Sequence, residues 1–155
     1  MTPFRFPLEK VLEWRRTQLD LAEAQFRRQA AALAELDRAY AEAEATGNQA
    51  ELQVRGWNPL AGRDLAALGI FRLYMKKREG EIDLSREDCR KELAARRAAM
   101  LEARRRLRLL ERLRERRYEE WRLANERELE SLASESYLAR WSRQAGAPGS
   151  REPAS

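Results

Sequence analysis

The stretch from Ser85 to Trp141 contains neither proline nor glycine, and this constrains the fold more than any other feature of the chain. Leucine, alanine, arginine and glutamate dominate it, and all four favour helix. One helix can run through the whole stretch, although helices of globular domains average about 11–12 residues. Uninterrupted helical sequence well beyond about 25 residues is typical of a coiled coil or a membrane span. Because the density of charge excludes the span, we expect a long helix that packs along a partner helix.

Apolar residues recur at seven-residue intervals in two parts of the chain, as they do along the seam of a coiled coil. The first series is Leu12, Leu19, Phe26, Leu33 and Tyr40. The second series is Leu93, Met100 and Leu107. Residues at such spacing are nearly always core, so we assign both series to the face between two helices. The predicted fold class is all-α: an elongated, antiparallel two-helix coiled-coil hairpin, whose connection has room for a short helix.

Glycine and proline mark the borders of these helices. The expected segments are an extended N-terminus at 1–6, helix one at about 7–46, a connection at about 47–63, helix two at about 64–141 and a disordered tail at 142–155. The tail is small, polar and rich in Pro and Gly, a composition that cannot bury a core. Within the connection, Asn58 and Pro59 can cap a short helix.

The unequal lengths of the two helices imply an overhang. With these bounds Asp64 lies level with Thr46, and Pro7 lies level with Ala103. Helix two therefore extends past helix one beyond Ala103. We expect this overhang to pack against Phe4 and Phe6 or against a partner.

The chain has no histidine and a single cysteine, Cys89. The commonest general base and the common transition-metal ligand sets are therefore missing. The adjacent carboxylates Glu119 and Glu120 point about 100° apart on a helix, so they do not form a catalytic pair. We expect a protein that is not an enzyme, with no catalytic residues, no cofactor and no metal site.

Positive charge is concentrated in the second helix. The formal net charge is +5, and fourteen Arg or Lys face seven Glu between Arg90 and Arg127. Such a surface is either a solvated face or a docking surface for an acidic partner. Nucleic acid is one candidate, but the glutamates stand three and four residues from the arginines and can pair with them. Nucleic acid is therefore the less favoured partner.

Targeting and membrane-spanning patterns are missing from this sequence. The segment from Met1 to Lys10 has no apolar run of the about 7–15 residues found in a secretory signal. The longest largely apolar run elsewhere, Leu65 to Phe71, is shorter than the about 20 residues that cross a bilayer. We expect a cytoplasmic protein without direct membrane insertion.

The segment from Phe4 to Leu12, FRFPLEKVL, resembles the start of flagellar export proteins of the FliJ family. The plan of the rest, from a first coiled-coil helix through a turn to a longer basic helix with the acidic segment Asn125 to Ser136, is similar to that family as well. The resemblance covers about residues 4–141. It implies a component of the flagellar type III secretion apparatus, and so a part in motility and chemotaxis.

The resemblance also implies partners. Proteins of this family are similar in fold to the central stalk of rotary ATP synthases; they insert into the hexameric ring of the export ATPase, contact the membrane-embedded export gate, and in some cases escort export chaperones. The gate contact involves the turn-proximal halves of both helices. The residues in the matching regions here are Leu36, Tyr40, Phe71, Tyr74 and Met75. The match is regional, and all except Tyr74 also fit positions of the seam.

If the export ATPase is the partner, we expect it to recognise the end of the rod where helix one starts, because a rod enters a ring by its tip. The exposed cations expected there are Arg15, Arg16, Arg116, Arg117 and Arg122. They can meet acidic loops through charge-assisted hydrogen bonds.

Two other classes of function remain open at this point. One is a structural coiled-coil adaptor, including the stalk protein of a virulence secretion system. The other is a basic rod that binds nucleic acid.

Overall fold

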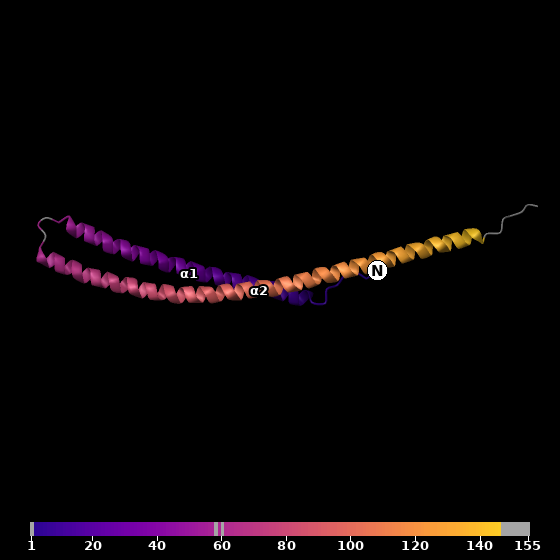
Figure 1. Cartoon of the computed structure of the whole chain (residues 1–155), viewed down its shortest axis with the longest axis horizontal. Coiled ribbons are helices and arrows are strands. Elements are labelled where there is room, and N and C mark those ends of the chain that lie inside the picture. Colours follow the sequence, from indigo (N-terminus) through magenta and orange to yellow (C-terminus); the bar gives the residue numbers. More distant parts are fainter. Residues whose placement is uncertain (1, 58, 60, 147–155) are drawn as a thin grey trace, which may run out of the picture. The chain divides into compact units, whose positions relative to one another are not determined.

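The computed structural model describes residues 2–57, 59 and 61–146. Two helices account for almost all of them: α1, Glu9–Arg55, with 47 residues, and α2, Gly62–Ala145, with 84. The described residues contain no strand. The two helices pack against each other in opposite directions, which confirms the predicted all-α helical hairpin (Figure 1).

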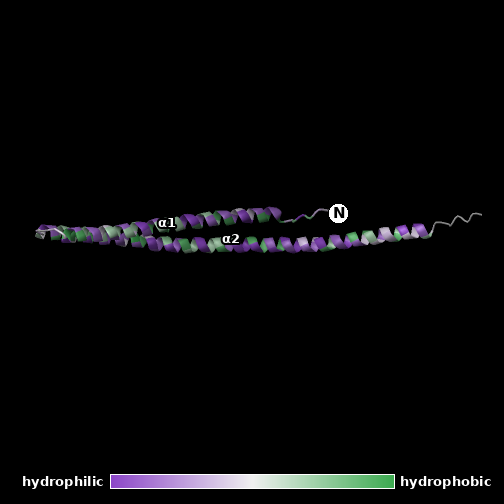
Figure 2. Ribbon diagram, turned by 90° about the horizontal axis from the view of Figure 1, so that it is seen from above, coloured by the Kyte–Doolittle hydropathy of each residue, from purple (hydrophilic) through white to green (hydrophobic). Residues whose placement is uncertain are grey.

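The chain divides into two compact units. We call Glu13–Leu107 the hairpin unit, and we call Met1–Leu12 with Arg108–Ser155 the terminal unit. In the hairpin unit, Figures 1 and 2 both show α1 and α2 side by side from the connection onward. Figure 2 also shows hydrophilic and hydrophobic residues alternating along each helix, as expected for helices that bury one stripe.

The least exposed residues of α1 recur at spacings of three and four along its whole length. The expected series from Leu19 to Tyr40 is half-buried, and it continues two heptads further, through Gly47 to Val54, which is buried. On α2, the buried residues of the hairpin unit are Leu68, Met75, Cys89 and Leu107. This seam is the core of the hairpin unit.

Helix α1 ends at Arg55 rather than near residue 46, because Gly47 belongs to the seam. A Cβ at Gly47 would lie 3.9 Å from the Cβ and Cγ of Met75, so this glycine faces α2 at close range. Glycine costs a helix about 1 kcal/mol relative to alanine, and burial of Val54 in the following turns offsets that cost. The expectation that Gly47 and Asn48 end the helix was wrong.

The connection between the helices is correspondingly shorter, at residues 56–61. The expected short helix depends on Asn58, which lies outside the described residues, and Gly56, Trp57, Pro59 and Ala61 are not helical. Helix α2 is capped instead by Asp64, whose carboxylate accepts a hydrogen bond from the Ala61 amide at 3.3 Å.

The shorter connection shifts the register of the two helices. The expected register sets Asp37 beside Leu73, but Asp37 binds Arg86 at 2.8 Å, and Glu51 binds Arg72 at 2.5 Å. The predicted alignment was wrong, because both helices reach further toward the connection than the glycine pattern suggested.

The ends of the helices also differ from the expected bounds. Helix α1 begins at Glu9, after a turn at Pro7 and Leu8, rather than at Pro7 itself. Helix α2 continues past Trp141 to Ala145, since the next glycine along the chain is Gly146. Residues 147–155 of the expected tail lie outside the described residues.

Candidate interaction surfaces

In the hairpin unit, the candidate gate residues divide between the seam and the surface. Met75 is buried, Leu36, Tyr40 and Phe71 are half-buried, and Tyr74 is 56% exposed. Met75, Leu36 and Phe71 thus stabilise the hairpin, whereas Tyr74 is available to a partner.

Three of these residues line one groove. Phe71, Tyr74, Met75 and Arg78 of α2 line an open groove of about 300 Å³ together with Ala39, Glu42, Ala43 and Thr46 of α1. Its lining thus combines apolar side chains with one carboxylate and one guanidinium. Such a groove suits a side chain from a partner better than a small molecule held on all sides.

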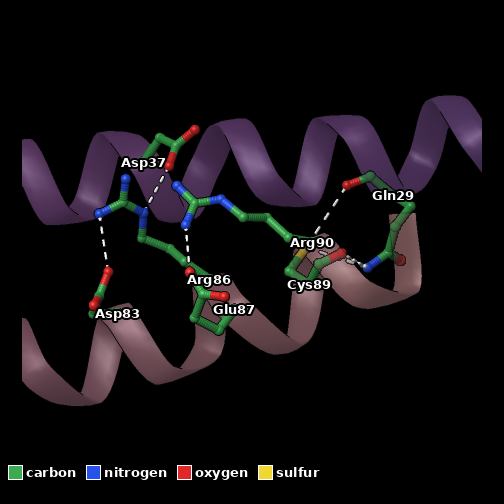
Figure 3. A network of polar contacts seen from close by, with 7 residues as sticks. All are labelled: Gln29, Asp37, Asp83, Arg86, Glu87, Cys89 and Arg90. Atoms are coloured by element: carbon green, nitrogen blue, oxygen red, sulfur yellow. Dashed lines mark hydrogen bonds and ion pairs between the residues drawn. The ribbon is translucent and has the colours of Figure 1, made fainter. Parts of the chain in front are cut away.

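Tyr40 does not line this groove but lies against Arg86, which belongs to a polar network that links the two helices (Figure 3). The Arg86 guanidinium lies 4.5 Å from the centroid of the Tyr40 ring and binds Asp37 at 2.8 Å and Asp83 at 3.3 Å. With its side chain only 17% exposed, Arg86 ties α1 to α2. The heptad spacing of apolar residues predicts the seam, but it does not predict this network of polar residues.

Gln29 and Cys89 make the second part of this network (Figure 3). Gln29 Nε2 donates to Cys89 Sγ at 3.2 Å and to the Cys89 carbonyl at 3.4 Å. The Cys89 thiol in turn donates to the Gln29 carbonyl at 3.8 Å. Gln29, a half-buried polar residue in the seam of α1, is therefore satisfied by Cys89, the one cysteine of the chain, which is buried and free.

Two of the candidate ATPase residues, Arg15 and Arg16, lie in the hairpin unit. Arg15 is half-buried, with its guanidinium 4.7 Å from the centroid of the Trp14 ring, and Arg16 is exposed. The other three, Arg116, Arg117 and Arg122, are exposed on α2 of the terminal unit. The five residues thus belong to different units.

Two of these three exposed arginines form ion pairs along their own helix. Arg117 binds Glu120 at 3.1 Å, and Arg122 binds Glu119 at 2.8 Å. Exposed pairs of this kind contribute little to stability, typically about 0.2–1 kcal/mol, and they exchange readily for another partner. Both arginines remain available for contacts with an acidic surface.

The N-terminal residues of the terminal unit bind α2 through aromatic rings. Phe4 packs edge-on against Tyr118, with ring centroids 5.3 Å apart, and lies 5.9 Å from Trp121. Trp121 Nε1 donates to the Thr2 carbonyl at 3.2 Å, and Phe6 is buried. The expectation that Phe4 and Phe6 pack where helix two extends is consistent with this aromatic clasp, defined here as Thr2, Phe4, Tyr118 and Trp121.

The start of α1 is held by an ion pair to α2. Arg114 Nε binds Glu9 Oε2 at 3.1 Å, whereas the expected register sets residue 101 beside Glu9. The start of α1 therefore reaches further along α2 than expected. Leu12, in the first turn of α1, is fully buried.

Two features that would support another kind of function are missing from the described part of the chain. No group of three or more Cys, Asp or Glu side chains there is placed to hold a metal ion. None of its helices combines the length and the apolar composition needed to cross a bilayer. Comparison with protein-family models, with curated proteins and with solved structures finds no match to this chain.

Proposed function

We propose that this chain is a non-enzymatic, cytoplasmic component of a flagellar protein export apparatus, a coiled-coil stalk that binds the ring of the export ATPase and the export gate. The observation that carries the proposal is the FRFPLEKVL segment at Phe4–Leu12. It resembles the start of FliJ-family proteins. Two of its residues make contacts with α2 within the terminal unit: Phe4 is part of the aromatic clasp, and Glu9 binds Arg114.

The helical hairpin supports this proposal physically. Two helices packed along one seam make a stiff element with charged outer faces, which can contact a ring through weak polar pairs and bias its assembly or turnover. Such an element needs no catalytic group of its own. Association with the inner membrane is then peripheral, through the export apparatus.

The surfaces suggest how the two contacts are divided. The groove at Tyr74 offers an exposed aromatic ring to the gate. Arg116, Arg117 and Arg122 offer exposed cations to acidic loops of the ATPase. Contacts made by such cations accelerate association and weaken as salt rises.

The ATPase contact is tested by changing Arg116, Arg117 and Arg122 together to Glu and measuring stimulation of the export ATPase and assembly of its ring. We expect both to be lost. The matched control reverses Arg27, Arg28 and Arg97, which are exposed on the hairpin unit, and should leave both unchanged. Equal stimulation by the two variants, with helix content intact, would exclude the terminal unit as the ATPase surface.

The gate contact is tested separately with Tyr74→Ala in a pull-down with the export gate. The control is Tyr137→Ala, which removes an exposed tyrosine of the terminal unit. We expect the first change to weaken gate binding and the second to have no effect. The reverse result would mean that the two contacts have been assigned to the wrong units.

The alternative classes predict different results. A nucleic-acid-binding rod would lose DNA affinity steeply as salt rises, but pairing of its arginines with glutamates at Arg104, Arg106, Arg114, Arg117 and Arg122 disfavours it. A structural adaptor or a virulence secretion stalk would bind no flagellar ATPase, and the neighbouring genes would separate flagellar from virulence systems.

A further inference from the structure

Helix α2 carries a second heptad series in the hairpin unit, in addition to the one that packs on α1. Spacings of three and four residues connect six positions, here called the outer stripe: Ile70, Leu73, Lys77, Gly80, Leu84 and Glu87. Four of them, Ile70, Leu73, Lys77 and Leu84, lie two residues beyond the seam positions Leu68, Phe71, Met75 and Ile82. Two residues correspond to about 200° around a helix, so the outer stripe lies opposite the seam.

The large apolar residues of the outer stripe are exposed. Leu73 is 73% exposed, Ile70 71% and Leu84 70%. A single exposed leucine is ordinary, but here Ile70 and Leu84 stand two heptads apart and Leu73 shares their face, which indicates a face that packs against another helix. No residue of α1 covers this face, because α1 occupies the other side of α2.

Gly80 interrupts the outer stripe with a gap. It stands in the middle of a long helix, where glycine is unfavourable. A Cβ at this position would meet nothing within 4 Å, so nothing inside the chain requires a glycine there. The gap lies one helical turn before Leu84, so a large side chain and an open space alternate on the same face.

We propose that the outer stripe binds the outer stripe of a second copy of this chain, with the two α2 helices antiparallel. When the two-fold axis lies midway between Gly80 and Leu84, Leu84 of each copy fills the gap at Gly80 of the other. The same axis sets Lys77 opposite Glu87 on both sides, and it sets Ile70 and Leu73 opposite Ala94 and Lys91, which are exposed and continue the spacing of the outer stripe along α2. Each Leu84 then meets a Gly80, and each Lys77 meets a Glu87. Both contacts occur twice, once on each side of the two-fold axis, as in an isologous interface.

The opposite orientation lacks this complementarity. In a parallel pair each position faces itself, so Lys77 meets Lys77 and Glu87 meets Glu87, and two glycines leave the gap open. Glu87 binds Arg90 at 2.6 Å on its own helix, and this exposed pair can be exchanged for Lys77 of the second copy. The sequence of the stripe therefore favours antiparallel pairing.

Self-association is independent of the proposed export function. The stripe does not include Tyr74 or the arginines of the terminal unit. The seam with α1 also remains intact in the dimer. Failure of the export proposal would leave the dimer unaffected, and failure of the dimer would leave the export proposal untouched.

The experiment measures the mass of the full chain by light scattering and sedimentation equilibrium over a concentration series. We expect a reversible dimer for the unchanged protein. Gly80→Leu fills the gap without contacting anything in its own chain and improves helix propensity, so its helix content should not fall. It should nevertheless weaken the dimer at least about tenfold, because Leu84 of the second copy no longer fits.

Charge reversal tests the antiparallel register. Lys77→Glu alone and Glu87→Lys alone should each weaken the dimer, and an equal mixture of the two variants should form a heterodimer. The double variant Lys77→Glu with Glu87→Lys should restore self-association. Arg28→Glu, a reversal on the exposed face of α1, is the matched control and should change nothing.

Three results would overturn the proposal. The first is a monomer at every concentration, which would leave the stripe to some other partner. The second is a dimer that survives Gly80→Leu and both single charge reversals. The third is failure of the double variant to recover, which would exclude the antiparallel register.

Discussion

The two units bury their residues by different means. In the hairpin unit, two long helices share a periodic seam whose buried residues are aliphatic or sulfur-containing, and polar pairs such as Asp37 with Arg86 connect the helices at intervals. In the terminal unit, a short N-terminal segment is fixed to one helix by a few aromatic rings and the ion pair of Glu9 with Arg114. Stability is therefore distributed over many turns in the first unit and concentrated at a few contacts in the second.

This difference predicts how each unit responds to damage. A distributed seam loses stability as a whole when one position is charged, because the helices cannot separate locally. A segment held at few points can open by itself while the rest stays folded.

The largest effect is expected from Met75→Asp in the hairpin unit. Met75 is 6% exposed, so a carboxylate there would lose most of its hydration. We expect the free energy of unfolding to fall by about 3 kcal/mol or more, measured by chemical denaturation. The control is Tyr74→Asp at the neighbouring, exposed position, where the loss should stay below about 1 kcal/mol. Similar losses for the two variants would show that the seam has been assigned to the wrong face.

A smaller and local effect is expected from Phe4→Ala in the terminal unit. It removes both ring contacts of Phe4, with Tyr118 and Trp121, and each such pair contributes about 0.5–1.5 kcal/mol beyond area burial. Hydrogen exchange at residues 2–8 should accelerate, while exchange in the hairpin unit and the melting temperature of that unit should remain unchanged. Acceleration throughout the chain would mean that the two units unfold together.

The same contrast explains what the sequence could predict. The seam of α1 was predictable because Leu12 to Tyr40 repeat every seven residues, and a repeat of that kind fixes a helix face without knowledge of the partner. The register was not predictable, since it depends on where each helix ends, and Gly47 resembles a helix terminus although it lies in the seam against Met75.

The interaction surfaces were predictable only in part. Packing of Phe4 and Phe6 follows from the overhang of one helix past another, and Phe4 does contact α2. The network of Arg86, Asp37 and Asp83 carries no periodic signal, because ion pairs between helices depend on the register. Met75, one of the residues matched to the gate by resemblance, is buried. The apolar residues that make a coiled coil recognisable in sequence are the same residues that fill its core.

A moderate effect is expected from Arg86→Met, which keeps the aliphatic stem of the side chain and removes its charge. The change removes ion pairs with Asp37 and Asp83 and the contact with the Tyr40 ring. We expect a loss of about 1 kcal/mol in dilute buffer that shrinks as salt is added.

The control for this change is Arg38→Met. Arg38 binds Glu35 at 3.0 Å with both side chains at least 65% exposed, so its removal should cost less than about 0.5 kcal/mol. Equal losses at the two arginines would mean that the network in Figure 3 adds nothing beyond an ordinary surface pair.

The smallest effect is expected from Gly47→Ala, and its sign tests how closely the helices of the hairpin unit approach. The added Cβ would lie 3.9 Å from Met75, an ordinary van der Waals distance, so the methyl group should fit without moving α2. Alanine also favours helix over glycine, and we expect stabilisation by about 0.5–1 kcal/mol in chemical denaturation. Gly69→Ala provides the comparison, because a Cβ there meets nothing within 4 Å and reports helix propensity alone. A gain at Gly69 together with a loss at Gly47 would show that the seam needs glycine for close packing near the connection.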